Sequence, residues 1–460
     1  MTLIKSISGI RGTIGGKTQE NLTPLDIVLF ASAYASWLKS SIPADHYTVV
    51  VGRDARISGK MVQSLVNETL VGMGIDVIDL GLSTTPTVEM SVVELKAQGG
   101  IIITASHNPK QWNALKLLND KGEFLNENSG MKILKIAESQ GFNYASVEEL
   151  GKITPVSNSI ESHIEQVLSL PIIQLESIKK AKFKVIVDAV NSTGGIALPM
   201  LLNKLNVEVV ELYCTPDGNF PHNPEPLKEH LDELCNQVLF HKADFGIVVD
   251  PDVDRLAFVD EKGEMFGEEY TLVACADYVL SKKSGNTVSN LSSTRALADV
   301  TNKYGGTYHA CAVGEVNVVE KMKEVNAVIG GEGNGGIIYP ELHYGRDALV
   351  GIGIFLSLLS ENQLKVSELR SSYPAYFMSK TKVNLDPKTD VSGLLIKMKE
   401  KYSKQNPIMI DGVKIEFDNA WVHLRKSNTE PIIRVYTEAP SQVESDDLAK
   451  RFLEEIETNS

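Results

Sequence analysis

Two features that would place a protein in a membrane or outside the cell are missing from this sequence. The longest apolar run, residues 348–359, is shorter than the roughly 18 residues that a membrane span needs, and the N-terminal segment MTLIKSISGIRG lacks the apolar core of a signal peptide. The four cysteines lie far apart and form no CxxC pair, so neither a zinc site nor a disulfide framework is predicted. We therefore expect a cytoplasmic protein without a membrane partner.

Positive charge is also scarce. The chain has 45 Lys and Arg against 59 Asp and Glu, a net charge of -14, whereas nucleic-acid-binding surfaces need an excess of basic residues. We expect no nucleic-acid partner, and any anionic ligand must be held by a local cluster of cations. The length of 460 residues and the hydrophobic content of 43% indicate a globular protein with several domains.

Alternating strand-like and helical segments indicate three α/β units followed by a small α+β unit. Runs such as YTVVVG at 47–52 and GIIIT at 100–104 alternate with helical stretches such as 58–73, which is typical of a mostly parallel sheet covered by helices. The same alternation returns twice further along the chain. We place the four domains at residues 1–150, 151–255, 256–371 and 372–460.

Each α/β unit contains one unusual polar loop directly after a strand-like run. The loops are TASHNP at residues 104–109, DPDVDR at 250–255 and GEGNGG at 331–336. Open α/β sheets bind ligands at the carboxyl ends of their strands. We therefore expect the three loops to face one shared cleft.

The DPDVDR loop is a candidate metal site. Asp250, Asp252 and Asp254 occupy alternate positions, so in an extended loop their carboxylates project to one side and repel one another unless a cation lies among them. Oxygen ligands of this kind suit Mg²⁺. An EF-hand calcium loop fits poorly because Arg255 stands where that loop requires glycine. An aspartate-rich turn without an ion is the simpler alternative.

Ser106 is a candidate nucleophile in the TASHNP loop, with His107 next to it and Lys116 ten residues further on. The loop does not match the GxSxG elbow of esterases. Taken alone, a serine at this position is a turn or cap residue, and a lysine such as Lys116 is a solvated strand end.

Two further loops suit a phosphorylated sugar. GEGNGG surrounds Glu332 and Asn334 with glycines, so the backbone can approach a ligand while a carboxylate and an amide meet its hydroxyls. RKSNTEP at 425–431 combines Arg425 with hydroxyls, an amide and backbone N–H groups, the composition of an anion-binding nest, and Arg434 follows it. The alternatives are a flexible surface turn and an ordinary hairpin turn.

Together these motifs resemble those of the α-D-phosphohexomutases, a family of four-domain enzymes. SGIRG at residue 8, TASHNP, the aspartate loop, the glycine-rich loop and an RxSxTEP-like loop follow in the family's order along the whole chain. The resemblance implies three similar α/β domains and a C-terminal α+β domain around a central cleft. It also implies transfer of a phosphoryl group between positions 1 and 6 of a hexose phosphate, through phosphorylated Ser106 and a hexose 1,6-bisphosphate, which acts as intermediate and activator.

The resemblance further implies a role for individual residues. Mg²⁺ would be bound by phosphorylated Ser106 together with Asp250, Asp252 and Asp254. The catalytic groups would be Ser106, Lys116, Arg11 and His107, with Lys116 expected to transfer a proton. The substrate-binding residues would be Arg255, Glu332, Asn334, Arg425, Ser427, Asn428, Thr429 and Arg434. The sequence leaves the oligomeric state open, a homodimer included.

The preferred hexose is indicated by two short segments. Val313-Gly314-Glu315 resembles the VGD of phosphoglucosamine mutases more than the TGH of phosphomannomutases, and together with the GEGNGG form of the sugar loop it resembles the archaeal-type branch of the phosphoglucosamine mutases. We therefore expect glucosamine phosphate, with Glu315 favouring the amine, unless Glu315 only complements a helix N-terminus. The alternatives are a phosphomannomutase or phosphoglucomutase, a metal-dependent sugar phosphatase that uses the same Ser106, and a non-catalytic sugar-phosphate-binding protein.

Overall fold

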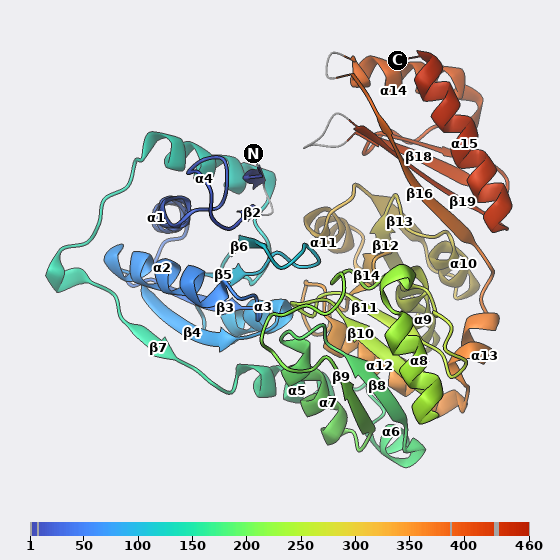
Figure 1. Cartoon of the computed structure of the whole chain (residues 1–460), viewed down its shortest axis with the longest axis horizontal. Helices are drawn as coiled ribbons and strands as arrows, with labels where there is room; N and C mark the ends of the chain where they lie inside the picture. Colours follow the sequence, from blue (N-terminus) through green and yellow to red (C-terminus); the bar gives the residue numbers. More distant parts are fainter. Residues whose placement is uncertain (1, 7–8, 387–388, 427–431, 460) are drawn as a thin grey trace.

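The computed structural model of the chain describes residues 2–6, 9–386, 389–426 and 432–459 and contains four sheets. Three of the sheets combine parallel strands with one or more antiparallel strands at one side and are covered by helices, and the fourth is antiparallel (Figure 1). This confirms the predicted architecture of three α/β domains, here I to III, and a C-terminal α+β domain IV. Within the described ranges, no helix has the length and apolarity needed to cross a membrane.

Domain I contains a seven-stranded sheet in the order β1-β2-β6-β5-β3-β4-β7. Helices α1, α2 and α4 pack on one face, where most of the domain's core lies, and α3 packs on the other. The elements are β1 (Ile4–Ser6), β2 (Gly9–Thr13), α1 (Pro24–Ser41), β3 (Thr48–Arg53), α2 (Gly59–Gly72), β4 (Asp76–Leu82), α3 (Thr85–Glu94), β5 (Gly99–Ile103), β6 (Trp112–Leu118), α4 (Glu127–Ser139) and β7 (Ile153–Pro155).

Domains II and III repeat one topology. Their sheets have the orders β9-β8-β10-β11 and β13-β12-β14-β15, in which three parallel strands are followed by an antiparallel fourth. The strands are β8 (Lys184–Asp188), β9 (Glu208–Leu212), β10 (Phe245–Val249), β11 (Leu256–Val259), β12 (Asn286–Asn290), β13 (Tyr308–Cys311), β14 (Ala327–Glu332) and β15 (Gly336–Ile338). Because β11 pairs with β10, the second sheet continues past residue 255 to Val259.

The helices of domains II and III cover their sheets. They are α5 (Ser159–Ser169), α6 (Leu175–Ala181), α7 (Gly194–Lys204), α8 (Asp232–His241), α9 (Glu268–Lys282), α10 (Ala296–Lys303), α11 (Glu315–Glu324), α12 (Ala348–Asn362) and α13 (Val366–Ser371). The apolar run at 348–359 is the buried helix α12, as expected from its length.

The same strand order occurs in domain I, where β4-β3-β5-β6 matches the four strands of each later sheet. In each of the three sheets the polar loop connects a parallel strand to the antiparallel strand beside it, namely β5 to β6, β10 to β11 and β14 to β15. The loops at 104–109 and 250–255 follow β5 and β10, and the loop at 331–336 spans the turn from β14 to β15. The repeated topology therefore carries all three loops to equivalent positions.

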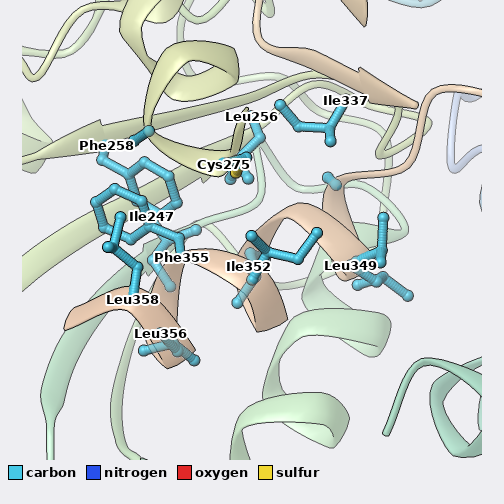
Figure 2. Packing of buried hydrophobic residues seen from close by; sticks show 14 of the residues in the cluster. Ile247, Leu256, Phe258, Cys275, Ile337, Leu349, Ile352, Phe355, Leu356 and Leu358 are labelled. Atoms are coloured by element: carbon cyan, nitrogen blue, oxygen red, sulfur yellow. The ribbon is translucent and has the colours of Figure 1, made fainter. Parts of the chain in front are cut away.

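Domains II and III share one hydrophobic core, which fixes two of the loops relative to each other. Phe258 of β11 stacks on Phe355 of α12, with ring centroids 3.8 Å apart, and Ile337 of β15 lies in the same cluster (Figure 2). A close-packed core tolerates little relative movement of the elements that form it. The loops after β10 and β14 are thus held on one rigid base.

Domain IV has its own core and contacts domain III through polar groups. Its sheet has the order β16-β19-β18-β17 and packs against two helices. The Ser292 hydroxyl lies 2.8 Å from Nδ1 of His423, and the Arg295 backbone N–H donates to Glu438. The elements are β16 (Phe377–Asn384), α14 (Val391–Lys401), β17 (Val413–Glu416), β18 (Trp421–Lys426), β19 (Ile432–Ala439) and α15 (Gln442–Asn459).

Candidate active site

The three polar loops meet at one cavity of about 760 Å³, which confirms the predicted shared cleft. Ser106 of domain I, Arg255 of domain II and Glu332 of domain III each bring their own loop to its wall. The first turns of α4 and α11 supply further lining residues. Among the described residues, all of the lining comes from domains I to III.

Ser106 lies at the tip of its loop in a strained backbone conformation. Its φ is +47°, a region that residues other than glycine seldom adopt. The Ser106 hydroxyl donates a hydrogen bond of 2.6 Å to Oδ2 of Asp250, and its backbone N–H donates to the Thr104 hydroxyl. The loop thus points the serine oxygen at the aspartate cluster of the next domain.

Arg56 holds the Ser106 loop in this shape. Its buried guanidinium is paired with Asp54 and donates hydrogen bonds to four backbone carbonyl oxygens of the loop, those of Ser106, Asn108, Pro109 and Trp112. Charge-assisted hydrogen bonds are stronger than neutral ones. These contacts hold the backbone of Ser106 in its strained conformation.

The three aspartates form the predicted cluster. Asp250, Asp252 and Asp254 are fully buried, and one carboxylate oxygen of each lies within 4.8 Å of the other two. Oδ2 of Asp252 accepts hydrogen bonds from Thr85 and Lys116. Oδ1 of Asp252 and Oδ1 of Asp254 are buried, and no described residue donates a hydrogen bond to either.

These orphaned oxygens fit a bound cation. Buried acceptors without partners are costly, and hard oxygen ligands in this number suit a divalent ion. Burial and the two neighbouring aspartates raise the pKa of Asp250. Burial acts in the same direction on Asp254, but Arg346 and Lys116 outweigh it and hold the pKa of that carboxyl below its usual range. Cations therefore compensate the charge of Asp254 more fully than that of Asp250, beside Ser106.

Four cationic or basic side chains line the cavity next to Ser106: Arg11, His107, Lys116 and Arg255. Burial lowers the pKa of Lys116, but the carboxylates of Asp252 and Asp254 outweigh it and raise the pKa above its ordinary value. Lys116 therefore carries its proton at neutral pH. Burial and the nearby guanidinium groups lower the pKa of His107 to about 2, so its imidazole is neutral.

Arg11 and Arg255 are each oriented by a neighbouring loop. Arg11, on β2, donates to the Asn108 side chain at 3.2 Å, and Arg255 donates to Glu225 of domain II at 3.3 Å. Both side chains line the cavity. The predicted cations are thus brought together around the serine.

The residues predicted to bind the sugar line the same cavity. Oε1 of Glu332 accepts hydrogen bonds from Asn290 and from the Gly314 backbone N–H, and Oε2 accepts one from Arg346. The Asn334 side chain accepts a hydrogen bond from the Gly336 backbone N–H. Glu332 is thus anchored by protein groups at the wall that a sugar would meet.

The predicted phosphate loop lies in domain IV. Arg425 of β18 stands directly opposite Arg434 of β19, an arrangement of like charges that is unfavourable without an anion nearby. Asp411 binds Nε of Arg425 and also accepts the backbone N–H of Val313, which lines the cavity. Ser427, Asn428 and Thr429 lie outside the described residues.

Comparison with known proteins identifies the family. Sequence models for domains I, II and III (each an alpha/beta/alpha domain) and for the C-terminal domain of phosphoglucomutase/phosphomannomutase match residues 3–144, 161–263, 267–376 and 381–455. The chain belongs to the phosphoglucomutase/phosphomannomutase family. It is therefore a phosphohexomutase, an isomerase that moves a phosphoryl group within a hexose phosphate.

Relatives match over nearly the whole length of this phosphohexomutase. A phosphoglucomutase/phosphomannomutase of Thermococcus kodakarensis is 34% identical, with 96% of each chain covered. A phosphoglucosamine/phosphogalactosamine mutase of Sulfurisphaera tokodaii is 31% identical, with 98% of each covered. A family structure from Burkholderia thailandensis has the same fold, with a TM-score of 0.83 at 24% identity and coverage of 99% of this chain and 98% of the other.

The phosphohexomutase site contains one central residue that the sequence motifs do not reveal. Arg346, just before α12, donates to Asp254 at 2.7 Å, to Glu332 at 2.8 Å and to Glu315 at 3.1 Å. Glu315 uses its other oxygen to accept the Arg346 backbone N–H. The Glu315 carboxylate, which we expect to favour a substrate amine, is thus paired with Arg346.

We predict that Arg346→Lys lowers both stability and activity. A lysine cannot contact three carboxylates at once, and leaving a buried charge without its partner costs about 3–5 kcal/mol. We expect a clear fall in the melting temperature and a loss of kcat/KM of more than about tenfold.

The control is Arg451→Lys, because the Arg451 side chain is 52% exposed and its pair with Glu455 lies on α15. Exposed pairs contribute about 1 kcal/mol or less. An Arg346→Lys enzyme as stable and active as this control would show that Arg346 does not hold the site together.

Proposed function

We propose that this phosphohexomutase interconverts glucosamine 6-phosphate and glucosamine 1-phosphate through phosphorylated Ser106 and a 1,6-bisphosphate. The observation that carries the mechanism is the hydrogen bond of 2.6 Å from the Ser106 hydroxyl into the buried aspartate cluster, at a cavity shared by three domains. The amino sugar is supported by the VGE segment at 313–315 and by the name of the Sulfurisphaera tokodaii relative.

In the first step the free hydroxyl of the bound hexose phosphate attacks the phosphoryl group on Ser106, the bond between phosphorus and the Ser106 oxygen breaks, and that oxygen ends with the proton that the hexose hydroxyl loses. The product is the bisphosphate. The bisphosphate then turns around, and its other phosphoryl group returns to the Ser106 oxygen. At that point the hydroxyl proton of Ser106 must leave, and the Asp250 carboxylate already accepts its hydrogen bond. Phosphoryl transfer needs mainly alignment and charge neutralisation, so one oxygen nucleophile among cations suffices.

Asp250, Asp252 and Asp254 would hold Mg²⁺ together with the oxygen of Ser106. Bound there, the ion would supply positive charge to the oxygens of the transferring group. Lys116, Arg11 and Arg255 line the same wall and neutralise charge that the metal leaves uncompensated. Lys116 is charged in this arrangement, which suits that task, and its part in proton transfer stays a prediction.

Arg425 and Arg434, with the loop that contains Ser427, Asn428 and Thr429, are proposed to bind the phosphate that is not being transferred. The two arginines are cross-strand neighbours on β18 and β19 and outnumber the carboxylate of Asp411 that pairs with Arg425, which supports an anion site there. Holding the distal phosphate aligns the hydroxyl that is attacked. Since Asp411 connects Arg425 to the cavity wall at Val313, this site and the reacting end are physically linked.

A second candidate substrate is a neutral hexose phosphate. The Thermococcus kodakarensis relative carries the name phosphoglucomutase/phosphomannomutase, and the pairing of Glu315 with Arg346 removes one reason to expect an amine. Relative kcat/KM values for the 6-phosphates of glucosamine, glucose and mannose distinguish the two. The highest value for glucosamine 6-phosphate supports the proposal, and the highest value for either neutral sugar contradicts it.

We predict that Ser106→Ala loses the phosphorylated form and nearly all turnover. Intact mass of fresh wild-type enzyme should show a phosphorylated species that the variant lacks. A catalytic amount of hexose 1,6-bisphosphate should reactivate dephosphorylated wild type and leave Ser106→Ala inactive. Turnover of the variant near the wild-type rate would rule out the phosphoserine route.

We predict that Asp252→Asn loses activity far more than stability. Removing one carboxylate relieves repulsion within the cluster, so the folded state loses little stability. The same change removes a metal ligand worth several kcal/mol, and we expect kcat to fall by at least about 100-fold. Added Mg²⁺ should raise the melting temperature of chelated wild type, because ligands of the folded state stabilise it, and should have little effect on the variant. Full activity after exhaustive chelation would argue against a catalytic metal.

A further inference from the structure

The cavity wall contains two carboxylates that have no partner within the described chain. Glu127 at the start of α4 and Glu320 on α11 line the cavity, and no described residue forms a hydrogen bond or ion pair with the carboxylate of either. The other glutamates of the wall, Glu315 and Glu332, are both paired with Arg346. Because the substrate is anionic, an unpaired carboxylate here repels it, and its presence calls for a physical explanation.

Glu127 has a local explanation. It is the first residue of α4, where the partial positive charge of the helix N-terminus favours an acidic side chain. Glu320 lies in the middle of α11, outside the first turn in which that effect acts. The charge of Glu320 is therefore not explained by its own helix.

The lysines nearest to Glu320 on α11 are already paired with other groups. Lys321 binds Glu324 at 2.8 Å, and Lys323 binds Glu123 of domain I at 2.5 Å. α11 lies on the side of domain III that faces domain I (Figure 1). Asn317 and Glu320 are three residues apart, so they share one face of the helix, and both line the cavity.

Charge is thus distributed unevenly along the cavity. Arg11, Lys116 and Arg255 line the cavity together with Ser106, whereas Glu320 places an unpaired negative charge on the part of the cavity that α11 forms. A ligand that complements both has phosphate at its reacting end and a cationic group elsewhere. Glucosamine phosphate, with an ammonium group at C2, has both, whereas glucose and mannose phosphates lack the cation.

We propose that Glu320 determines specificity for the amino sugar by pairing with the ammonium group of glucosamine phosphate. This inference rests on the proposed glucosamine phosphate activity and moves the amine-binding role from Glu315 to a carboxylate that is free to take it. Glu320 acts on substrate choice and takes no part in phosphoryl transfer.

The test is Glu320→Gln, which keeps the size of the side chain and removes its charge. We expect kcat/KM for glucosamine 6-phosphate to fall about fivefold, the effect of a partly exposed ion pair, with kcat/KM for glucose 6-phosphate unchanged or higher. Glu320→Asp should keep most of the preference. Glu324→Gln, on the same helix but paired with Lys321, is the matched control and should change neither value.

The outcomes separate this inference from the proposed function. If wild type prefers glucosamine 6-phosphate and Glu320→Gln keeps that preference, or loses kcat/KM equally for both sugars, the role of Glu320 is overturned and the glucosamine activity stands. If wild type prefers a neutral hexose phosphate, the proposed function is overturned and the inference with it. Thermal unfolding of each variant confirms folding, since an exposed substitution of this kind changes stability by about 0.5 kcal/mol or less.

Discussion

The site contains several buried carboxylates close together, and it depends on cations that compensate their negative charge. Asp250, Asp252 and Asp254 gather beside Ser106, and two glutamates of domain III lie next to them. Buried carboxylates at such separations cannot all stay ionised unless cations lie among them. Lys116 from domain I and Arg346 from domain III supply two positive charges, and the proposed metal would bind where oxygens of Asp252 and Asp254 accept no hydrogen bond from the described residues.

The architecture explains why these groups meet although they come from distant parts of the chain. One strand order, used in three sheets, presents a loop between a parallel strand and its antiparallel neighbour. The core shared by domains II and III fixes two of these loops on one base, and Arg56 shapes the third. Domain IV, attached by polar contacts, brings Arg425 and Arg434 on a separate sheet.

The sequence predicted much of the fold and the reacting end of the site, because the informative residues there are contiguous. Strand-like and helical runs are local patterns, and TASHNP, DPDVDR and GEGNGG each place their side chains on one loop. Arg346 and Arg56 were missed since their partners are carboxylates and carbonyl oxygens far away in sequence. For the same reason the pairing of Glu315 with Arg346, which leaves Glu320 and Glu127 as the unpaired glutamates of the described cavity wall, was not visible in the sequence.

A labelled phosphoryl group, followed through a single turnover, shows whether Ser106 carries the group that moves between positions of the hexose. Enzyme carrying a radioactive phosphoryl group on Ser106 would be mixed with unlabelled glucosamine 6-phosphate and quenched over time. If Ser106 carries the transferred group, the label leaves the Ser106 peptide and appears first in hexose bisphosphate and then in hexose monophosphate. Label that is released as inorganic phosphate, or that stays on the protein while product forms, would contradict transfer through Ser106.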